Sequence, residues 1–172
     1  MGDDAVMGFR KYVLQDYSVN TTFKIRLLLF LFRLSCWVKL GGVMRYLLFF
    51  VPPFYRFLSD WLMSIDLPVG TTVGPRLRIF HGYSIVVGKG ATIGADCIIR
   101  QGVTIGRKID KDGVPSKDPV ISDGVEFGAY SSVIGDVEVG ANCRLGVGVS
   151  VYENLPPNSI VVAQKYRVIA GS

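Results

Sequence analysis

Histidine is almost absent from this sequence of 172 residues, since it occurs once, at position 81. Chemistry that needs a base near neutral pH therefore has His81 as its candidate. The three cysteines, Cys36, Cys97 and Cys143, lack CxxC spacing, so they form neither a metal site nor a disulfide framework. We interpret the cysteines as packing residues in a reducing compartment, and we predict no metal.

Long apolar runs are also missing. Between residues 23 and 65 the longest uncharged stretch is 46–55, ten residues that include Pro52 and Pro53. A transmembrane helix needs roughly 18 or more apolar residues. The first 22 residues do not show the charged start, apolar core and cleavage site of an export signal. The sequence therefore predicts a cytoplasmic chain that does not cross a membrane.

The formal net charge of +5 is modest and spread along the chain, whereas a nucleic-acid duplex needs many phosphate contacts. We therefore predict no nucleic-acid partner.

Residues 24–40 and 54–65 have helical apolar spacing. Six basic residues accompany the single acid Asp60 in this region: Lys24, Arg26, Arg33, Lys39, Arg45 and Arg56. This composition predicts peripheral contact of residues 23–65 with an anionic membrane; packing on neighbouring subunits is the alternative.

Glycine and aliphatic residues dominate from about residue 66 onward, in a six-residue repeat. Apolar residues recur from Val69 to Ile105 and again from Ile121 to Val151, and many are followed by Gly. Two inward residues in every six describe a short strand and a turn, and three such sides close a triangular coil. We predict a mostly β chain with a parallel β-helix over 66–172, preceded by a helical region over 1–65. His81 occupies an inward position that is otherwise apolar, and such violations tend to mark function.

The repeat stops at a charged segment rich in Gly and Pro, about residues 107–120. This segment must leave the coil as a protruding loop. It follows the coil that carries His81, which suggests a lid over a cofactor; plain solvated surface is the alternative.

Five segments resemble the serine acetyltransferase branch of the hexapeptide-repeat acyltransferases, and within it the colanic-acid-type exopolysaccharide O-acetyltransferases. They are 15–17 (QDY), 28–34 (LLFLFRL), 79–87 (IFHGYSIVV), 101–106 (QGVTIG) and 161–168 (VVAQKYRV). The family pairs an Asp with a His fifteen residues later, as Asp66 and His81 stand here. The resemblance implies a left-handed β-helix and a homotrimer with active sites between subunits. It also implies acetyl-CoA as donor, His81 as general base and Asp66 as the group that orients the imidazole.

The resemblance also implies binding residues. Those for coenzyme A are Gly106, Arg107, Ala129, Val147, Lys165 and Arg167, and those for the acceptor are Phe80, Tyr83, Lys117 and Asp118. Phe80 replaces the acid that the family has before its His, and Asp118-Pro119 replaces its His-Pro, so an amino-acid ammonium would lose its counter-charge. We therefore expect a saccharide hydroxyl of exopolysaccharide or capsule biosynthesis as acceptor, on a lipid carrier or not, at the inner face of the membrane. The alternatives are an enzyme for serine or another small acceptor, and a non-enzymatic trimeric β-helix scaffold.

Overall fold

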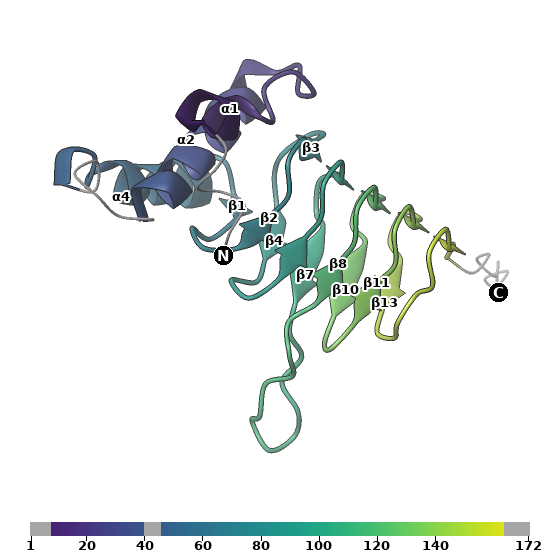
Figure 1. Ribbon diagram of the computed structural model, residues 1–172. Helices are drawn as coiled ribbons and strands as arrows, with labels where there is room; N and C mark the ends of the chain where they lie inside the picture. Colours follow the sequence, from purple (N-terminus) through teal and green to yellow (C-terminus); the bar gives the residue numbers. More distant parts are fainter. Residues whose placement is uncertain (1–7, 40–45, 164–172) are drawn as a thin grey trace, which may run out of the picture.

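The computed structural model describes residues 8–39 and 46–163, and it consists of helices packed on one end of a β-helix (Figure 1). The helices are α1 (Phe9–Leu14), α2 (Phe23–Lys39), α4 (Val51–Arg56) and the π-helix η1 (Phe57–Leu62). Helix α2 matches the first predicted helix. The second begins earlier than predicted, because Pro52 and Pro53 stand in its first turn, where a missing N–H costs no helical hydrogen bond.

Three parallel sheets form the three sides of the coil. We name them the β1 sheet (order β1-β4-β7-β10-β13), the β2 sheet (β11-β8-β5-β2) and the β3 sheet (β14-β12-β9-β6-β3). The strands are β1 (Ile65–Asp66), β2 (Thr72–Val73), β3 (Arg78–Ile79), β4 (Ile85–Val87), β5 (Thr92–Ile93), β6 (Ile98–Ile99), β7 (Thr104–Gly106), β8 (Val120–Ile121), β9 (Glu126–Phe127), β10 (Ser132–Ile134), β11 (Glu138–Val139), β12 (Arg144–Leu145), β13 (Ser150–Val151) and β14 (Ile160–Val161). From β1 to β13 each strand pairs in parallel with strands three places away, and β14 pairs with β12, so the predicted parallel β-helix is confirmed, with a shorter last coil.

Aliphatic side chains fill the inside of the coil, as the repeat predicts. Ile99, Ile105 and Phe127 are at most 1% exposed, and Cys97 and Cys143 are fully buried beside them. Burial raises the pKa of the Cys97 thiol to about 11, because an apolar interior disfavours the thiolate. These two cysteines are packing residues, as predicted.

The register of the repeat is confirmed from Val87 onward and is wrong by two residues before it. Ile79 pairs with Ile99 and Val87 pairs with Ile105, so eight residues separate the inward Ile79 and Val87, where six separate Ile99 and Ile105. The first coil therefore has two extra residues at this corner. Position 75 is only partly buried and His81 is exposed, so the predicted inward placement of His81 is wrong.

A loop leaves the coil between Gly106 and Val120, as predicted, and Figure 1 shows it as a long hairpin-like excursion. One antiparallel bridge, Ile109 to Pro115, joins its two arms. At its base the Asp118 carboxylate packs on Gly90, where a Cβ would lie 2.1 Å from Oδ2. Gly90 is thus required for this close approach.

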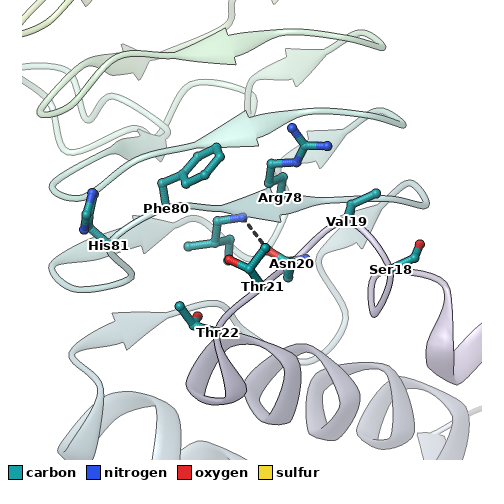
Figure 2. A pocket seen from close by; sticks show the side chains of 9 residues that line it. Ser18, Val19, Asn20, Thr21, Thr22, Arg78, Phe80 and His81 are labelled. Carbon is teal, nitrogen blue, oxygen red and sulfur yellow. Dashed lines mark hydrogen bonds between the residues drawn. The ribbon is translucent and has the colours of Figure 1, made fainter.

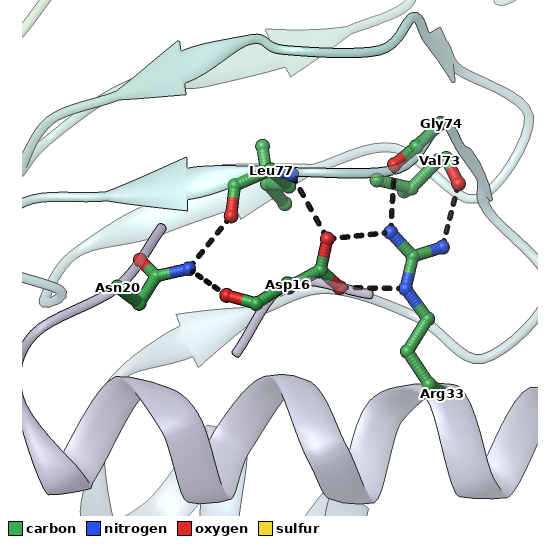
Figure 3. Close-up of polar contacts among 6 residues, drawn as sticks. All are labelled: Asp16, Asn20, Arg33, Val73, Gly74 and Leu77. Atoms are coloured by element: carbon green, nitrogen blue, oxygen red, sulfur yellow. Dashed lines mark hydrogen bonds and ion pairs between the residues drawn. The ribbon is translucent and has the colours of Figure 1, made fainter. Parts of the chain in front are cut away.

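A buried ion pair attaches the helices to the β-helix (Figure 3). The Arg33 guanidinium donates from Nε to Asp16 Oδ2 at 2.7 Å, and both side chains are at most 3% exposed. The same guanidinium donates to the carbonyl oxygens of Val73 at 2.6 Å and Gly74 at 2.7 Å. Arg33 therefore cannot meet lipid headgroups, and its predicted membrane contact is wrong.

Side chains from the α1–α2 segment also cover the free edge of β3. Leu77 N donates to Asp16 Oδ1 at 2.9 Å, and Ile79 N donates to Asn20 Oδ1 at 3.0 Å. Asn20 Nδ2 donates in turn to the Leu77 carbonyl at 2.8 Å. The first strand of the β3 sheet thus has its outer backbone groups satisfied by side chains.

Other basic residues of the helical region also bond within the chain. Lys24 Nζ donates to the Gly82 carbonyl, Lys39 Nζ donates to the Val69 carbonyl, and Arg26 Nε donates to the Asn20 carbonyl. Arg45 lies outside the described residues. In the described part of the chain, no helix is long and apolar enough to span a bilayer.

Candidate active site

His81 lies on the enlarged corner between β3 and β4. Its side chain is exposed, and its backbone adopts a φ of 50°, an uncommon left-handed conformation for a residue other than glycine. The next residue, Gly82, is buried, and its carbonyl accepts a hydrogen bond from Lys24 Nζ at 2.9 Å. Helix α2 therefore holds the turn, and backbone strain of this kind is often found at functional positions.

A cleft of about 530 Å³ opens beside His81 (Figure 2). Its lining residues come from the α1–α2 segment and from β3 with the following turn: Ser18, Val19, Asn20, Thr21, Thr22, Arg78, Ile79, Phe80 and His81. Figure 2 shows His81 at one end of the cleft and Ser18 at the other. An imidazole at the mouth of a cleft can reach a hydroxyl of a molecule bound inside it.

The cleft carries aromatic, hydroxyl and cationic groups. The guanidinium carbons of Arg78 and Arg100 lie 6.0 Å and 5.7 Å from the centre of the Phe80 ring. Arg100 is held by an ion pair with Glu126 at 2.8 Å. None of the described lining residues has a carboxylate. The cleft therefore suits a neutral or anionic polyhydroxy compound better than an ammonium.

The second member of the predicted catalytic pair, Asp66, ends β1 and pairs in register with Val86 of β4. Its carboxylate accepts a hydrogen bond from Arg56 Nη1 at 2.9 Å, and the same guanidinium contacts Asp60 at 2.6 Å. No hydrogen bond joins Asp66 to His81 among the residues that the structure describes.

The predicted binding residues fall at two different corners of the coil. The corner of His81 also holds Phe80, Tyr83, Ala129 and Val147, whereas the corner at the loop holds Gly106, Arg107, Lys117 and Asp118. Arg107 Nε lies 3.7 Å from Asp118 Oδ1. The β1 sheet separates the two corners, so one chain does not bring the two sets together. Lys165 and Arg167 lie outside the described residues.

Tyr83 lies outside the lining of the cleft and interacts with Tyr130. A hydrogen bond with Tyr130 raises the pKa of Tyr83. The Tyr130 ring passes over Gly102, where a Cβ would lie 2.2 Å from the ring. Sequence reasoning missed Tyr130, and the repeat gave no signal for it.

Sequence reasoning also did not place Arg78, Lys24 or residues 18–22 at this site. The register assigned from the sequence did not identify Ile79 as inward or Arg78 as its outward neighbour, and nothing in the sequence indicated that the α1–α2 segment would cover Arg78. Over the described residues, no group of three or more His, Cys, Asp or Glu side chains could hold a metal ion.

No protein-family model matches the sequence, but individual proteins do. The chain is 37% identical over 114 residues to the colanic acid biosynthesis acetyltransferase WcaB of Escherichia coli strain K12, covering 66% of this chain and 68% of that protein. It is 33% identical over 119 residues to a serine acetyltransferase of Synechococcus elongatus, covering 69% of this chain and 48% of that protein.

A solved structure of similar fold is serine acetyltransferase isoform 3 of Entamoeba histolytica in complex with cysteine. It superposes with a TM-score of 0.75 at 22% identity over 95% of this chain. The chain spans 61% of that protein and about half of the Synechococcus enzyme. At this identity the likeness to the Entamoeba structure shows the fold alone.

Proposed function

Because the chain belongs to the hexapeptide-repeat acyltransferases, we propose that it moves an acetyl group from acetyl-CoA to a hydroxyl of a saccharide in exopolysaccharide or capsule biosynthesis. Membership makes the chain an acyltransferase, and the relatives named as acetyltransferases support acetyl as the group transferred. The relatives include both a protein of colanic acid biosynthesis and serine acetyltransferases. Serine or another small molecule therefore remains the alternative acceptor.

The observation that supports a saccharide is the lining of the cleft beside His81. Phe80 stands directly before His81, and Arg78 is the charged group among the described lining residues. An aromatic ring offers a flat apolar surface to the C–H face of a sugar ring, and the hydroxyls of residues 18–22 offer hydrogen bonds. The ammonium of serine would find no carboxylate among these residues, and burying it unpaired would be costly.

In the proposed reaction, His81 removes the proton of the acceptor hydroxyl as its oxygen attacks the acetyl carbon. The new C–O bond forms, the C–S bond of acetyl-CoA breaks, and the proton passes from His81 to the departing thiolate. Asp66 stabilises the imidazolium that forms transiently. This role requires the Asp66 carboxylate to contact His81 in addition to, or in place of, Arg56.

Acceptor specificity can be tested by the release of coenzyme A from acetyl-CoA. With the purified chain, we expect release with a panel of neutral and acidic oligosaccharides, free or on a lipid carrier, and at most slow release with serine. The Phe80→Asp variant restores a carboxylate before His81 and should shift the preference toward serine. Release with serine alone would favour the alternative, and no release with any acceptor would favour a scaffold.

The two corners that hold the predicted binding residues support a homotrimer. A groove between two subunits can combine the His81 corner of one with the loop corner of the next, which one chain cannot do. Apart from Asp66, which pairs with Arg56, the outward residues of the β1 sheet between these corners are uncharged, namely Val86, Thr104, Ser132 and Ser150. Such a surface suits close packing against another subunit and against a neutral pantetheine arm.

Light scattering on the purified chain should give a mass three times the 18.9 kDa of one chain. We expect Ser132→Glu, which places a charge among the uncharged outward residues of β4, β7, β10 and β13, to weaken this assembly and lower acetyl transfer together. The matched variant Thr72→Glu, on the exposed face of the β2 sheet, should change neither. A stable monomer with full activity would contradict the intersubunit site.

Peripheral membrane contact completes the proposal, because an acceptor on a lipid carrier would be presented at the inner face of the cell membrane. The burial of Arg33 removes part of the basic surface first expected to make this contact. The contact must then depend on another part of the helical region.

A further inference from the structure

The helix formed by α4 and η1 has one face fixed against the β-helix. Val51, Tyr55 and Ser59, four residues apart, are at most 5% exposed. The Tyr55 hydroxyl donates to the Leu67 carbonyl at 2.7 Å, inside the first coil. This anchored face determines which side of the helix points away from the protein.

The outer side of this helix and the segment just before it form a large exposed apolar surface, the aromatic face. Its members are Tyr46, Leu47, Phe49, Phe50, Phe54, Phe57, Trp61 and Leu62, each more than half exposed. Phe50, Phe54, Phe57 and Trp61 follow one another at intervals of four, three and four, which places them on one side of a helix. Trp61 is 81% exposed and stacks on Phe57 at 6.3 Å. Soluble proteins rarely expose apolar surface of this extent without a binding partner.

Two adjoining clefts border the aromatic face, and they share Lys39 and Pro52. One, of about 440 Å³, is also lined by Val38, Tyr46 and Phe49. The other, of about 300 Å³, is also lined by Pro53, Arg56, Pro68, Val69 and Lys89. Apart from Lys39, the residues that line the first cleft are apolar or aromatic, and the second cleft contains three cations.

The cations of the second cleft differ in availability. Arg56 is neutralised by Asp60 and Asp66. Lys39 and Lys89 are exposed and form no ion pair within the described residues, although Lys39 Nζ donates to the Val69 carbonyl. Adjoining clefts that combine apolar side chains with the ammonium groups of Lys39 and Lys89 fit a ligand with a hydrocarbon chain and an anionic head.

We propose that the aromatic face, with Lys39 and Lys89, docks on an anionic phospholipid bilayer. Lipid phosphates lie at the two lysines, and the aromatic face enters the boundary of the acyl chains. This inference rests on the proposed membrane contact and names its site, including Lys89, which lies in the β-helix. A second copy of the chain is a poorer occupant, because a two-fold contact would bring these cations toward one another.

Vesicle sedimentation with the full chain tests the site. Phosphatidylcholine vesicles that contain phosphatidylglycerol should pellet the protein more strongly than pure phosphatidylcholine, and high salt should release only part of it. Lys89→Ala should weaken anionic binding about fivefold, from the contribution of one basic residue near an anionic surface. The matched control Lys111→Ala removes a charge from the protruding loop and should leave binding unchanged.

Trp61→Ser should reduce the salt-resistant part of the binding, whereas Tyr152→Ser, which removes an exposed aromatic ring from the β-helix, should not. In a Trp37→Phe background, the fluorescence of Trp61 should shift to shorter wavelength with vesicles. The proposal would be overturned if the Trp61→Ser and Lys89→Ala variants bound vesicles as strongly as the unchanged protein, or if the fluorescence of Trp61 did not shift. If the unchanged protein did not bind vesicles and the Trp61→Ser variant formed a smaller assembly than the unchanged protein, the aromatic face would be assigned to contact with a second copy of the chain. Coenzyme A release with a soluble acceptor, measured in parallel, tests the proposed function separately.

Discussion

Replacement of His81 by Asn is expected to lower the rate of acetyl transfer by roughly 10²- to 10⁴-fold, the contribution typical of a general base. Asn accepts the left-handed backbone conformation that His81 adopts, with its φ of 50°, so the turn should be retained. The exposed imidazole contributes little to packing, so the folded assembly should also be retained. The measurement is coenzyme A release under single-turnover conditions, with thermal unfolding of the same sample.

His81→Ala provides the comparison that separates chemistry from strain. Ala lacks the base and is also disfavoured at positive φ, so this variant should lose the same activity and some thermal stability in addition. A His81→Asn enzyme that keeps more than about a tenth of the rate would mean that another group takes the proton. Since His81 is the one histidine of the chain, that group would have to be of another residue type.

Asp66→Asn should cause a smaller but still severe loss, because the imidazolium would lose its stabilising charge. This substitution also removes a partner of Arg56, so its control is Asp60→Asn, which removes the other partner of the same guanidinium. If both variants lose activity equally, the role of Asp66 is to position Arg56 rather than His81.

Replacement of Arg33 by Met is expected to destabilise the folded chain by about 3–5 kcal/mol, the cost of breaking a buried ion pair by removing one partner. The Asp16 carboxylate would remain buried without its cation, and the carbonyls of Val73 and Gly74 would lose their donor. Urea unfolding followed by circular dichroism measures this, at one protein concentration because an oligomer couples stability to concentration.

The matched control is Arg76→Met, which removes a second Arg–Asp pair. Arg76 and Asp96 are about half exposed, so solvent screens their interaction and its loss should cost much less than the loss of the Arg33 pair. Equal effects of the two substitutions would show that the Arg33 pair does not hold the helices on the coil. The double variant Asp16→Leu with Arg33→Met removes both charges and should recover part of the loss.

The β-helix was predictable because its signal is local: each inward residue and its turn repeat along the chain, independent of distant contacts. The exception is the corner at His81. Its two extra residues shift the register. In the sequence, however, His81 would interrupt the apolar pattern in the same way whether it pointed inward or lay on an exposed turn. Only the strand pairing of Ile79 and Val87 distinguishes them.

The helical region was less predictable, because its charged residues pair over long sequence separations. The sequence indicates that Arg33 is a basic residue on the polar face of an amphipathic helix. Its hydrogen-bond partners, however, lie 17 to 41 residues away in the sequence. The spacing of Asp66 and His81 indicates a catalytic pair, whereas the contact of Asp66 with Arg56 depends on how α4 packs on the first coil. The cleft beside His81 likewise requires residues 18–22 to fold over β3.

The side chains that cover the edge of β3 bear on how this chain avoids forming fibres. A parallel β-helix ends in open strand edges, and an open edge is a template on which a strand of another molecule can pair. Asp16 and Asn20 occupy the backbone donors of Leu77 and Ile79, and Asn20 also occupies the Leu77 carbonyl. A foreign strand would have to displace a buried carboxylate and amide before it could add there. The two side chains therefore block the addition of a foreign strand at the first strand of the β3 sheet.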